Sequence, residues 1–270
     1  MVKISDLLQA KYHSNMKIEY HDGEVVEMLF DKKLHSYKVG EEIAPSATRV
    51  LDIISKPALI PWALKVGANW LEKHFFHDED ASSKNTNVYK SRMALEPLLK
   101  GMKSAYRGTS KDALNIGSLT HEWVEEAINW KLGNGEIPEM PKQEECVNAI
   151  TAFQDWVGQN VVEWISSEEK LYHRKYQYAG TVDARAIING EYCVIDWKTS
   201  KAVYPEYHLQ VAAYAKAVED IYGKPVDATY ILRCDKATGR FEAVRSTDTD
   251  KNFEAFLNAL GLYRRLKELR

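Results

Sequence analysis

The pair Asn189-Gly190, set between two apolar segments, constrains the fold of this chain more than any other feature of the sequence. Residues 181–188 and 191–198 are rich in Val, Ile, Thr and Tyr, and a two-residue Asn-Gly connection favours a type I′ β-hairpin. Such a short loop also fixes the strand register. Counting outward from the turn places Asp183 directly opposite Asp196, with their Cβ atoms about 4.5–5.5 Å apart.

Lys198 lies two residues beyond Asp196 and therefore shares its face of the strand. The alternate residues, Cys193, Ile195 and Trp197, point to the other side. Directly opposed carboxylates are destabilising, so either one takes up a proton or a cation lies between them. A hard divalent ion such as Mg²⁺ would suit the two acids, and the lysine could steady a phosphate oxygen or a water. The alternative is an ordinary Asp–Lys ion pair on an exposed sheet face.

Composition indicates an ordinary globular chain. The 270 residues are 45% hydrophobic and 28% charged, with a net charge of −3, enough for one large domain or a core with a helical addition. The sequence contains no run of about 18 apolar residues, so no membrane span is expected, and the first residues lack the apolar core of a signal peptide. The three cysteines, Cys146, Cys193 and Cys234, form no CxxC pair, which excludes a cysteine zinc finger and a four-cysteine iron–sulfur cluster. A reducing cytoplasm fits this cysteine usage best.

The order of expected elements predicts an α/β fold with a mixed central sheet flanked by helices. Short strands are expected at 16–20, 24–30 and 34–39, and helices at 45–55, 57–76 and 88–106, the last bent or broken by Pro97. Residues 79–87 form a polar loop. Helices at 112–132 and 143–157 precede strands at 161–172, 180–188 and 191–198. A helix at 205–222, a strand at 227–233 and a closing helix at 248–269 follow.

Three motifs in this order resemble the PD-(D/E)XK nuclease superfamily, in particular its RecB-type branch with the phage-encoded and mitochondrial genome maintenance exonucleases. They are Gly180-x-x-Asp183, the stretch IDWKTS at 195–200, and Gln210-x-x-x-Tyr214 on the helix 205–222. Gly117-Ser118-Leu119-Thr120-His121 resembles a helix of the form G-x-x-x-H in that branch. The segment 45–51 resembles its "PSVT-x-x-L" stretch. The resemblance covers about residues 45–235 and implies a restriction-endonuclease-like core.

The resemblance implies a role for each matching residue. His121, Asp183, Asp196 and the backbone carbonyl of Trp197 would bind one or two Mg²⁺ or Mn²⁺ ions. Lys198 would orient the attacking water and stabilise the developing charge, while Gln210 and Tyr214 would position the substrate strand or the lysine. Read without the family, Tyr214 lies on an apolar helix stripe typical of a core residue, and His121 on a stripe where a buried structural histidine is the commoner outcome.

The sequence leaves open the roles of three glutamates near these motifs, Glu122, Glu125 and Glu169. The sequence HEWVE at 121–125 looks like the zinc-protease HExxH, but its second histidine is missing, which argues against that class. Glu122 and Glu125 could hold His121 in place or be solvated helix charges. Glu169, on the strand before the hairpin, is a candidate for the site or for a surface charge.

A substrate path is expected from a basic stretch at 84–111, which has seven Lys or Arg against the single Glu96, with Tyr89 and Tyr106 available to stack on bases. A solvated helix with a basic face is the alternative. The candidate substrate-binding residues are Ser46, Thr48, Lys90, Arg92, Lys103, Arg107 and Thr199.

The resemblance thus implies a single nuclease domain over 1–270. Strands and helices to residue 110 could form a DNA-binding arch, the catalytic core would span 111–250, and a C-terminal helix 251–270. The expected activity is a metal-dependent DNA exonuclease that prefers single strands or ends, acting in replication, recombination or repair in a bacterial or phage-infected cell, with a recombination or replication protein as a possible partner. The alternatives are a structure-selective or restriction-like endonuclease and a non-catalytic nucleic-acid-binding module.

Overall fold

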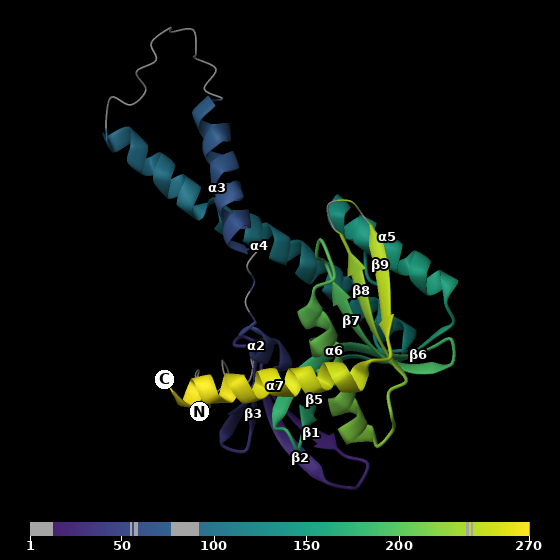
Figure 1. The fold of residues 1–270 in the computed structure, drawn as a ribbon. Helices are drawn as coiled ribbons and strands as arrows, with labels where there is room; N and C mark the ends of the chain where they lie inside the picture. Colours follow the sequence, from purple (N-terminus) through teal and green to yellow (C-terminus); the bar gives the residue numbers. More distant parts are fainter. Residues whose placement is uncertain are drawn as a thin grey trace, which may run out of the picture. The chain divides into compact units, whose positions relative to one another are not determined.

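The structure, a computed structural model, describes residues 13–54, 56, 59–76, 92–235, 238 and 240–269 (Figure 1). These residues form two compact units. The residues up to Ile54, together with those from Leu119 onward, make the first unit, and the described residues of 55–118 make the second. The N-terminal strands therefore lie in one unit with the residues from Leu119 onward. None of the helices in the described part combines the length and the apolar character needed to cross a membrane.

The first unit begins with a small antiparallel sheet in the order β1-β2-β3-β4. Its strands are β1 (His13–Glu19), β2 (Val25–Asp31), β3 (Ser36–Val39) and β4 (Glu42–Ala44). The three strands predicted from the sequence are present, and β4 is an addition. The short helix α2 (Ala47–Leu51) follows, and the Ser46 hydroxyl caps it by accepting the backbone N–H of Arg49. This hydrogen bond satisfies one of the N–H groups that the first turn of a helix leaves without a backbone partner.

A second, five-stranded sheet has the order β5-β6-β7-β8-β9. Its strands are β5 (Val162–His173), β6 (Tyr178–Ile188), β7 (Glu191–Lys198), β8 (Ala228–Cys234) and β9 (Phe241–Ser246). Strands β7 and β8 are parallel, joined by the crossover helix α6 (Pro205–Tyr222), and the other pairs are antiparallel. The predicted mixed sheet is confirmed, with β9 as an extra edge strand. The turn at Asn189 and Gly190 has φ of 50° and 89°, as a type I′ turn requires.

Helices cover both faces of this sheet (Figure 1). On one face, Phe153 of α5 (Glu144–Gln159) packs edge-on against Trp197, and Trp156 packs against Tyr230. On the other face, α6 contributes its apolar stripe to the main core, where it meets Val194 and the inner face of the small sheet. Helix α7 (Thr249–Glu268) packs on α6. Because Trp197 faces α5, its neighbours Asp196 and Lys198 face α6.

Two contacts attach the small sheet and α2 to β6 near its start. The backbone N–H of Ala179 donates to the carbonyl of Pro45 at 2.9 Å, and the hydroxyls of Tyr37 and Thr181 lie 2.7 Å apart. These contacts fix the N-terminal segment beside the strand that carries Asp183.

The long helix corrects one expectation. The sequence predicted separate helices at 88–106 and 112–132, but α4 (Arg92–Lys131) is a single helix, and it follows α3 (Leu59–Phe76) in the chain. Pro97 lies inside α4 without ending it. A proline in the second turn deprives few carbonyls of a partner, so the helix continues through Gly108 despite the weak helix formers around it. The predicted polar loop at 79–87 lies outside the described residues.

Candidate active site

Three carboxylates lie in a row across β5, β6 and β7. The pairing of β6 with β7 runs from Ile188 and Glu191 at the turn to Ala184 and Ile195, in the predicted register. The next position places Asp183 against Asp196. Here a side chain replaces the backbone acceptor of the strand pairing, because Asp183 Oδ2 accepts the backbone N–H of Trp197 at 2.7 Å.

The third acid is Glu168 on β5. Ser167 pairs with Ala184 and Glu169 with Val182, so Glu168 lies opposite Asp183. Its φ of 50° is in the left-handed region, which is uncommon for a residue with a side chain. Such backbone strain often accompanies a functional position.

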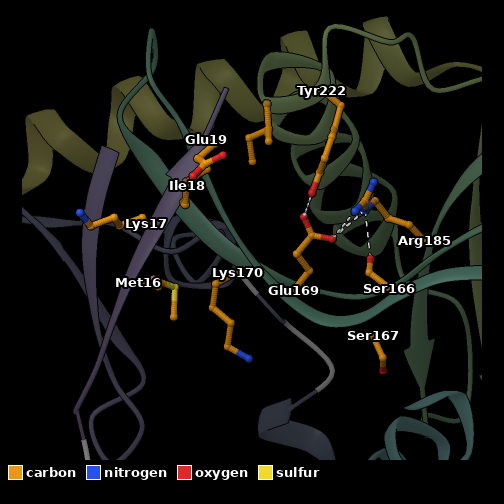
Figure 2. Close-up of a pocket in the computed structure, with 11 residues that line it drawn as sticks. Met16, Lys17, Ile18, Glu19, Ser166, Ser167, Glu169, Lys170, Arg185 and Tyr222 are labelled. Carbon is orange, nitrogen blue, oxygen red and sulfur yellow. Dashed lines mark hydrogen bonds and ion pairs between the residues drawn. The ribbon is translucent and has the colours of Figure 1, made fainter. Parts of the chain in front are cut away.

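Glu168, rather than Glu169, joins the acid row. A bulge between Trp164 and Ser166 shifts the register of β5 by one residue, and the sequence gives no clear signal for it. Glu169 instead lines a cavity between β1, β5 and α6 (Figure 2). There its carboxylate lies 2.6 Å from the guanidinium of Arg185 and accepts a hydrogen bond from the Tyr222 hydroxyl at 2.5 Å. It therefore has a structural ion-pair role.

His121 of α4 completes a group of candidate metal ligands. Its Nδ1 lies 3.8 Å from Asp183 Oδ2, and one ligand atom from each of His121, Glu168 and Asp183 lies within 4.8 Å of the others. The backbone of Trp197 is also within hydrogen-bonding reach of the His121 ring. This places the predicted backbone ligand, the Trp197 carbonyl, beside the same group.

Asp196 is placed differently from the other two acids. It is 1% exposed, its Oδ2 lies 2.6 Å from Lys198 Nζ, and its Oδ1 accepts a hydrogen bond from Gln210 at 3.0 Å. It lies outside the group of three that could share one ion here, so its predicted role as a metal ligand stays a prediction. In this structure its contacts position the lysine.

The electrostatics of the site favour a cation. Burial, followed by repulsion from Asp196 and Glu168, raises the pKa of Asp183 well above its usual value. Burial likewise raises the pKa of Glu168, and nearby Glu125 adds to the shift. Two lysines lie beside the three acids, Lys198 next to Asp196 and Lys170 with its Nζ 3.7 Å from Glu168 Oε2. With all three acids ionised, the cluster keeps an excess of negative charge that a divalent ion would neutralise.

The nitrogen ligand and the lysine have the protonation states that such a site needs. His121 remains partly exposed, yet burial, helped by the charge of Lys198, lowers its pKa to about 4, so the ring is neutral and able to bind a metal. Burial alone would lower the pKa of Lys198, but Asp196 and Asp183 outweigh it and raise the value. The ammonium is therefore charged at neutral pH.

The donor set fits a hard divalent cation. One neutral imidazole and two carboxylates suit Mg²⁺ or Mn²⁺, and the described residues bring no thiolate to the group. The three cysteines lie in the described part of the chain, where they are buried and form no disulfide.

Side chains of helix α6 extend the hydrogen-bond network of the acid row. Gln210 donates to Asp196, and its side-chain nitrogen also lies 3.0 Å from the hydroxyl of Tyr214. The ring of Tyr214 lies so close to Gly180 that a Cβ there would come within 2.5 Å of it. The structure thus combines both readings of Tyr214, since a buried core ring carries a hydroxyl into the site network.

The predicted substrate-binding residues are scattered. Ser46 is buried as a helix cap, Thr48 is exposed beside it, and Thr199 directly follows Lys198. Lys103 and Arg107 are exposed on the part of α4 in the second unit. Lys90 and the side chain of Arg92 lie outside the described residues. Their roles stay predictions.

One aromatic neighbour was missed. The ring of Tyr207, one helical turn before Gln210, lies below the ammonium of Lys198, with 5.0 Å between Nζ and the ring centroid. The i, i+3 spacing from Gln210 was a usable signal in the sequence.

Fold and site together define an α/β protein with an acid–lysine centre on a mixed sheet. The predicted resemblance to the PD-(D/E)XK nucleases is confirmed by one curated relative, Mitochondrial genome maintenance exonuclease 1 of Xenopus tropicalis, which is 41% identical over 59 residues. That match covers 20% of this chain and 17% of the relative, so the chain spans about a sixth of the relative's length. No protein-family model matches the chain.

Two solved structures are similar at low scores. The structure of SSO0001 is 15% identical, with a TM-score of 0.31, and the match covers 76% of this chain and 86% of that one. An alkaline exonuclease, LHK-Exo from Laribacter hongkongensis, is 15% identical with a TM-score of 0.26, over 54% of this chain and 84% of that one. At such scores, the fold assignment rests on the sheet topology described above.

Proposed function

We propose that this protein is a metal-dependent DNA exonuclease that hydrolyses phosphodiester bonds and prefers single strands or free ends. The observation that carries the proposal is the convergence of Glu168, Asp183 and His121 next to the paired Asp196 and Lys198. The name of the curated relative supports the reaction class, and a role in replication, recombination or repair follows from the same resemblance.

His121, Glu168 and Asp183 would hold the ion, with Asp196 and the Trp197 carbonyl as the further ligands that the motifs imply. A bound Mg²⁺ or Mn²⁺ would polarise the phosphate and lower the pKa of a water molecule. The protein's own contribution is to gather these ligands on three strands and one helix, so that the acids need not reorganise during the reaction.

Lys198 would act as a fixed positive charge. Its ammonium, which lies 2.6 Å from Asp196 Oδ2, would orient the attacking water and stabilise the negative charge that develops on the phosphate oxygens. Gln210 holds the other oxygen of Asp196, and Tyr214 backs Gln210. These contacts would fix the orientation of Asp196 and, through it, the position of the Lys198 ammonium.

A cleavage assay with Mg²⁺ or Mn²⁺ tests the proposal on three substrates: linear single-stranded, linear double-stranded and circular single-stranded DNA. We expect loss of the linear strands, with circles spared because they have no ends. Lys198→Ala should abolish cleavage while the variant stays folded by circular dichroism.

Each other outcome has a defined meaning. Cut circles would replace the exonuclease by an endonuclease. DNA binding without cleavage under any metal would leave a binding module on a nuclease fold. A fully active Lys198→Ala variant would overturn the assigned site.

A further inference from the structure

Two tyrosines lie where β7 leads into α6, immediately after Lys198. Tyr204 precedes the first turn of α6, and Tyr207 lies within that turn. Their rings meet edge to face with centroids 5.5 Å apart. Tyr207 also lies under the Lys198 ammonium, so an aromatic pair extends directly from the reactive lysine.

The stability of the fold offers little reason for a tyrosine at position 204. It occupies the N-cap position of α6, where Ser, Thr, Asp or Asn would cap the helix, yet its side chain makes no cap hydrogen bond. It is 41% exposed, whereas Tyr207 is only partly exposed. A large ring is thus displayed beside the site at a position that normally takes a small polar residue.

The loop that presents Tyr204 is held from below. Arg233 of β8 is 2% exposed, and its Nη1 donates to the carbonyls of Ser200 and Lys201 at 3.0 and 3.1 Å. The Ser200 hydroxyl donates to the carbonyl of Ala202 at 2.7 Å. Glu242 in turn accepts from the Arg233 Nε at 3.1 Å. A fixed loop can present a ring at low entropic cost to binding.

From this geometry we infer that Tyr204 is a stacking platform for the base of a nucleotide next to the cleaved phosphate, and that Tyr207 couples this platform to Lys198. The inference rests on the proposed function and deepens it. A base inside a duplex already stacks on its neighbours, so only a single strand or an unpaired end can offer a free face to Tyr204. The substrate at the cut is therefore unpaired.

Tyr207 is a positioning residue in this arrangement. Its ring contacts both the Lys198 ammonium and the ring of Tyr204, so it fixes the position of the ammonium and the orientation of the platform. Replacing it should lower kcat, whereas replacing Tyr204 should raise KM on single strands and leave kcat nearly unchanged. Tyr207→Phe keeps the ring and should restore the activity lost in Tyr207→Leu.

The test is a cycle that combines a protein change with a DNA change. Binding of a short single-stranded oligonucleotide is measured without divalent metal, so that no strand is cut. An abasic residue is placed at each position in turn. At one position, we expect removal of the base to weaken binding by about 5- to 150-fold, as for loss of one stacked base. Tyr204→Ala should weaken binding of the intact strand by a similar factor.

Stacking predicts that the two changes are not additive. Once the base is gone, Tyr204→Ala should cost nothing further, because both changes remove the same interaction. Tyr204→Trp should keep the affinity. Additive effects, or unchanged affinity of Tyr204→Ala for every strand, would overturn the inference.

Tyr222 provides a matched control. It ends the same helix, is 43% exposed, and is far from Lys198 along α6. Tyr222→Ala should leave strand binding unchanged, and an equal loss in both variants would indicate a general effect on the fold and overturn the platform. The proposed function fails separately: a wild-type protein that shows the stacking cycle but cuts no DNA keeps the platform and loses the exonuclease.

Discussion

At the scale of single residues, Gly180 shows why one motif position excludes a side chain. The ring of Tyr214 packs against its Cα, and a Cβ would come within 2.5 Å of the ring carbon Cε1. Tyr214 cannot retreat far, since it is 4% exposed and its hydroxyl lies within hydrogen-bonding distance of Gln210.

We therefore expect Gly180→Ala to cost about 1–3 kcal/mol of unfolding free energy, because overpacking a filled core has that typical cost. It should also lower activity by displacing Tyr214 from Gln210. Urea unfolding and the cleavage assay measure the two effects. Gly261→Ala is the control: this glycine lies inside α7 with open space around it, so alanine should stabilise the helix by about 0.5–1 kcal/mol. Equal stability of the two variants would contradict the packing argument.

The neighbouring pair Glu168 and Glu169 offers a second prediction at this scale. Glu168→Gln should weaken Mn²⁺ binding, measured by calorimetry, by about 10- to 100-fold or more, since it removes a carboxylate from the proposed metal-binding group. Glu169→Gln should leave metal binding intact and reduce stability, because it breaks the pair with Arg185. Reversed results would restore Glu169 to the site.

The same pair marks the limit of prediction from sequence. Asp183, Asp196 and Lys198 could be placed together because a two-residue turn fixes their register over a short distance. Glu168 lies beyond a bulge and itself has a left-handed backbone, and either feature changes which of two adjacent glutamates faces the site. Tertiary packing decides that choice.

At the scale of elements, turn residues and apolar patterning predicted β5 to β8 and α6, and the observed bounds lie close to the predicted ones. Helix α4 did not, because weak helix formers around Gly108 read as a break while neighbouring turns carry the helix across. The edge strands β4 and β9 were missed for a related reason: they are short and largely exposed, so no apolar alternation indicates them.

His173 joins three elements and gives a prediction about pH. It lies at the end of β5, its Nδ1 is 3.5 Å from Asp220 of α6, and its ring stacks on Phe253 of α7. Burial lowers its pKa to about 4, helped by Arg174, Lys175 and Lys216, and opposed by Asp220.

The unfolded chain, with an ordinary histidine pKa of about 6.5, binds this proton more readily than the folded chain does. Stability contributed by the neutral ring is therefore complete above about pH 6.5 and is lost as the pH falls toward 4. His173→Phe keeps the ring and removes the titration, so its melting temperature should fall less between pH 7 and 4.5 than that of the wild type. Parallel pH profiles would exclude His173 as a source of acid sensitivity.

At the scale of the whole molecule, the acid row links metal binding to folding. Without a cation, the fold must hold Glu168, Asp183 and Asp196 close together in a buried place. Mg²⁺ or Mn²⁺ should therefore raise the melting temperature, by an amount that corresponds to about 2.7 kcal/mol at a free concentration 100 times Kd. Asp183→Asn should abolish this shift, and it should be at least as stable as the wild type in EDTA because it removes one of three repelling charges. An equal metal shift in both proteins would place the stabilising ion elsewhere.

The hydrogen bond from the Trp197 amide to Asp183 has a consequence for observing the protein. At this point of the sheet, a backbone N–H donates to a side-chain carboxylate of the candidate site instead of to the backbone of a neighbouring strand. Its nuclear resonance and its exchange with deuterated water therefore depend on the charge of one carboxylate. A single amide signal would therefore report directly whether a cation occupies the proposed metal site.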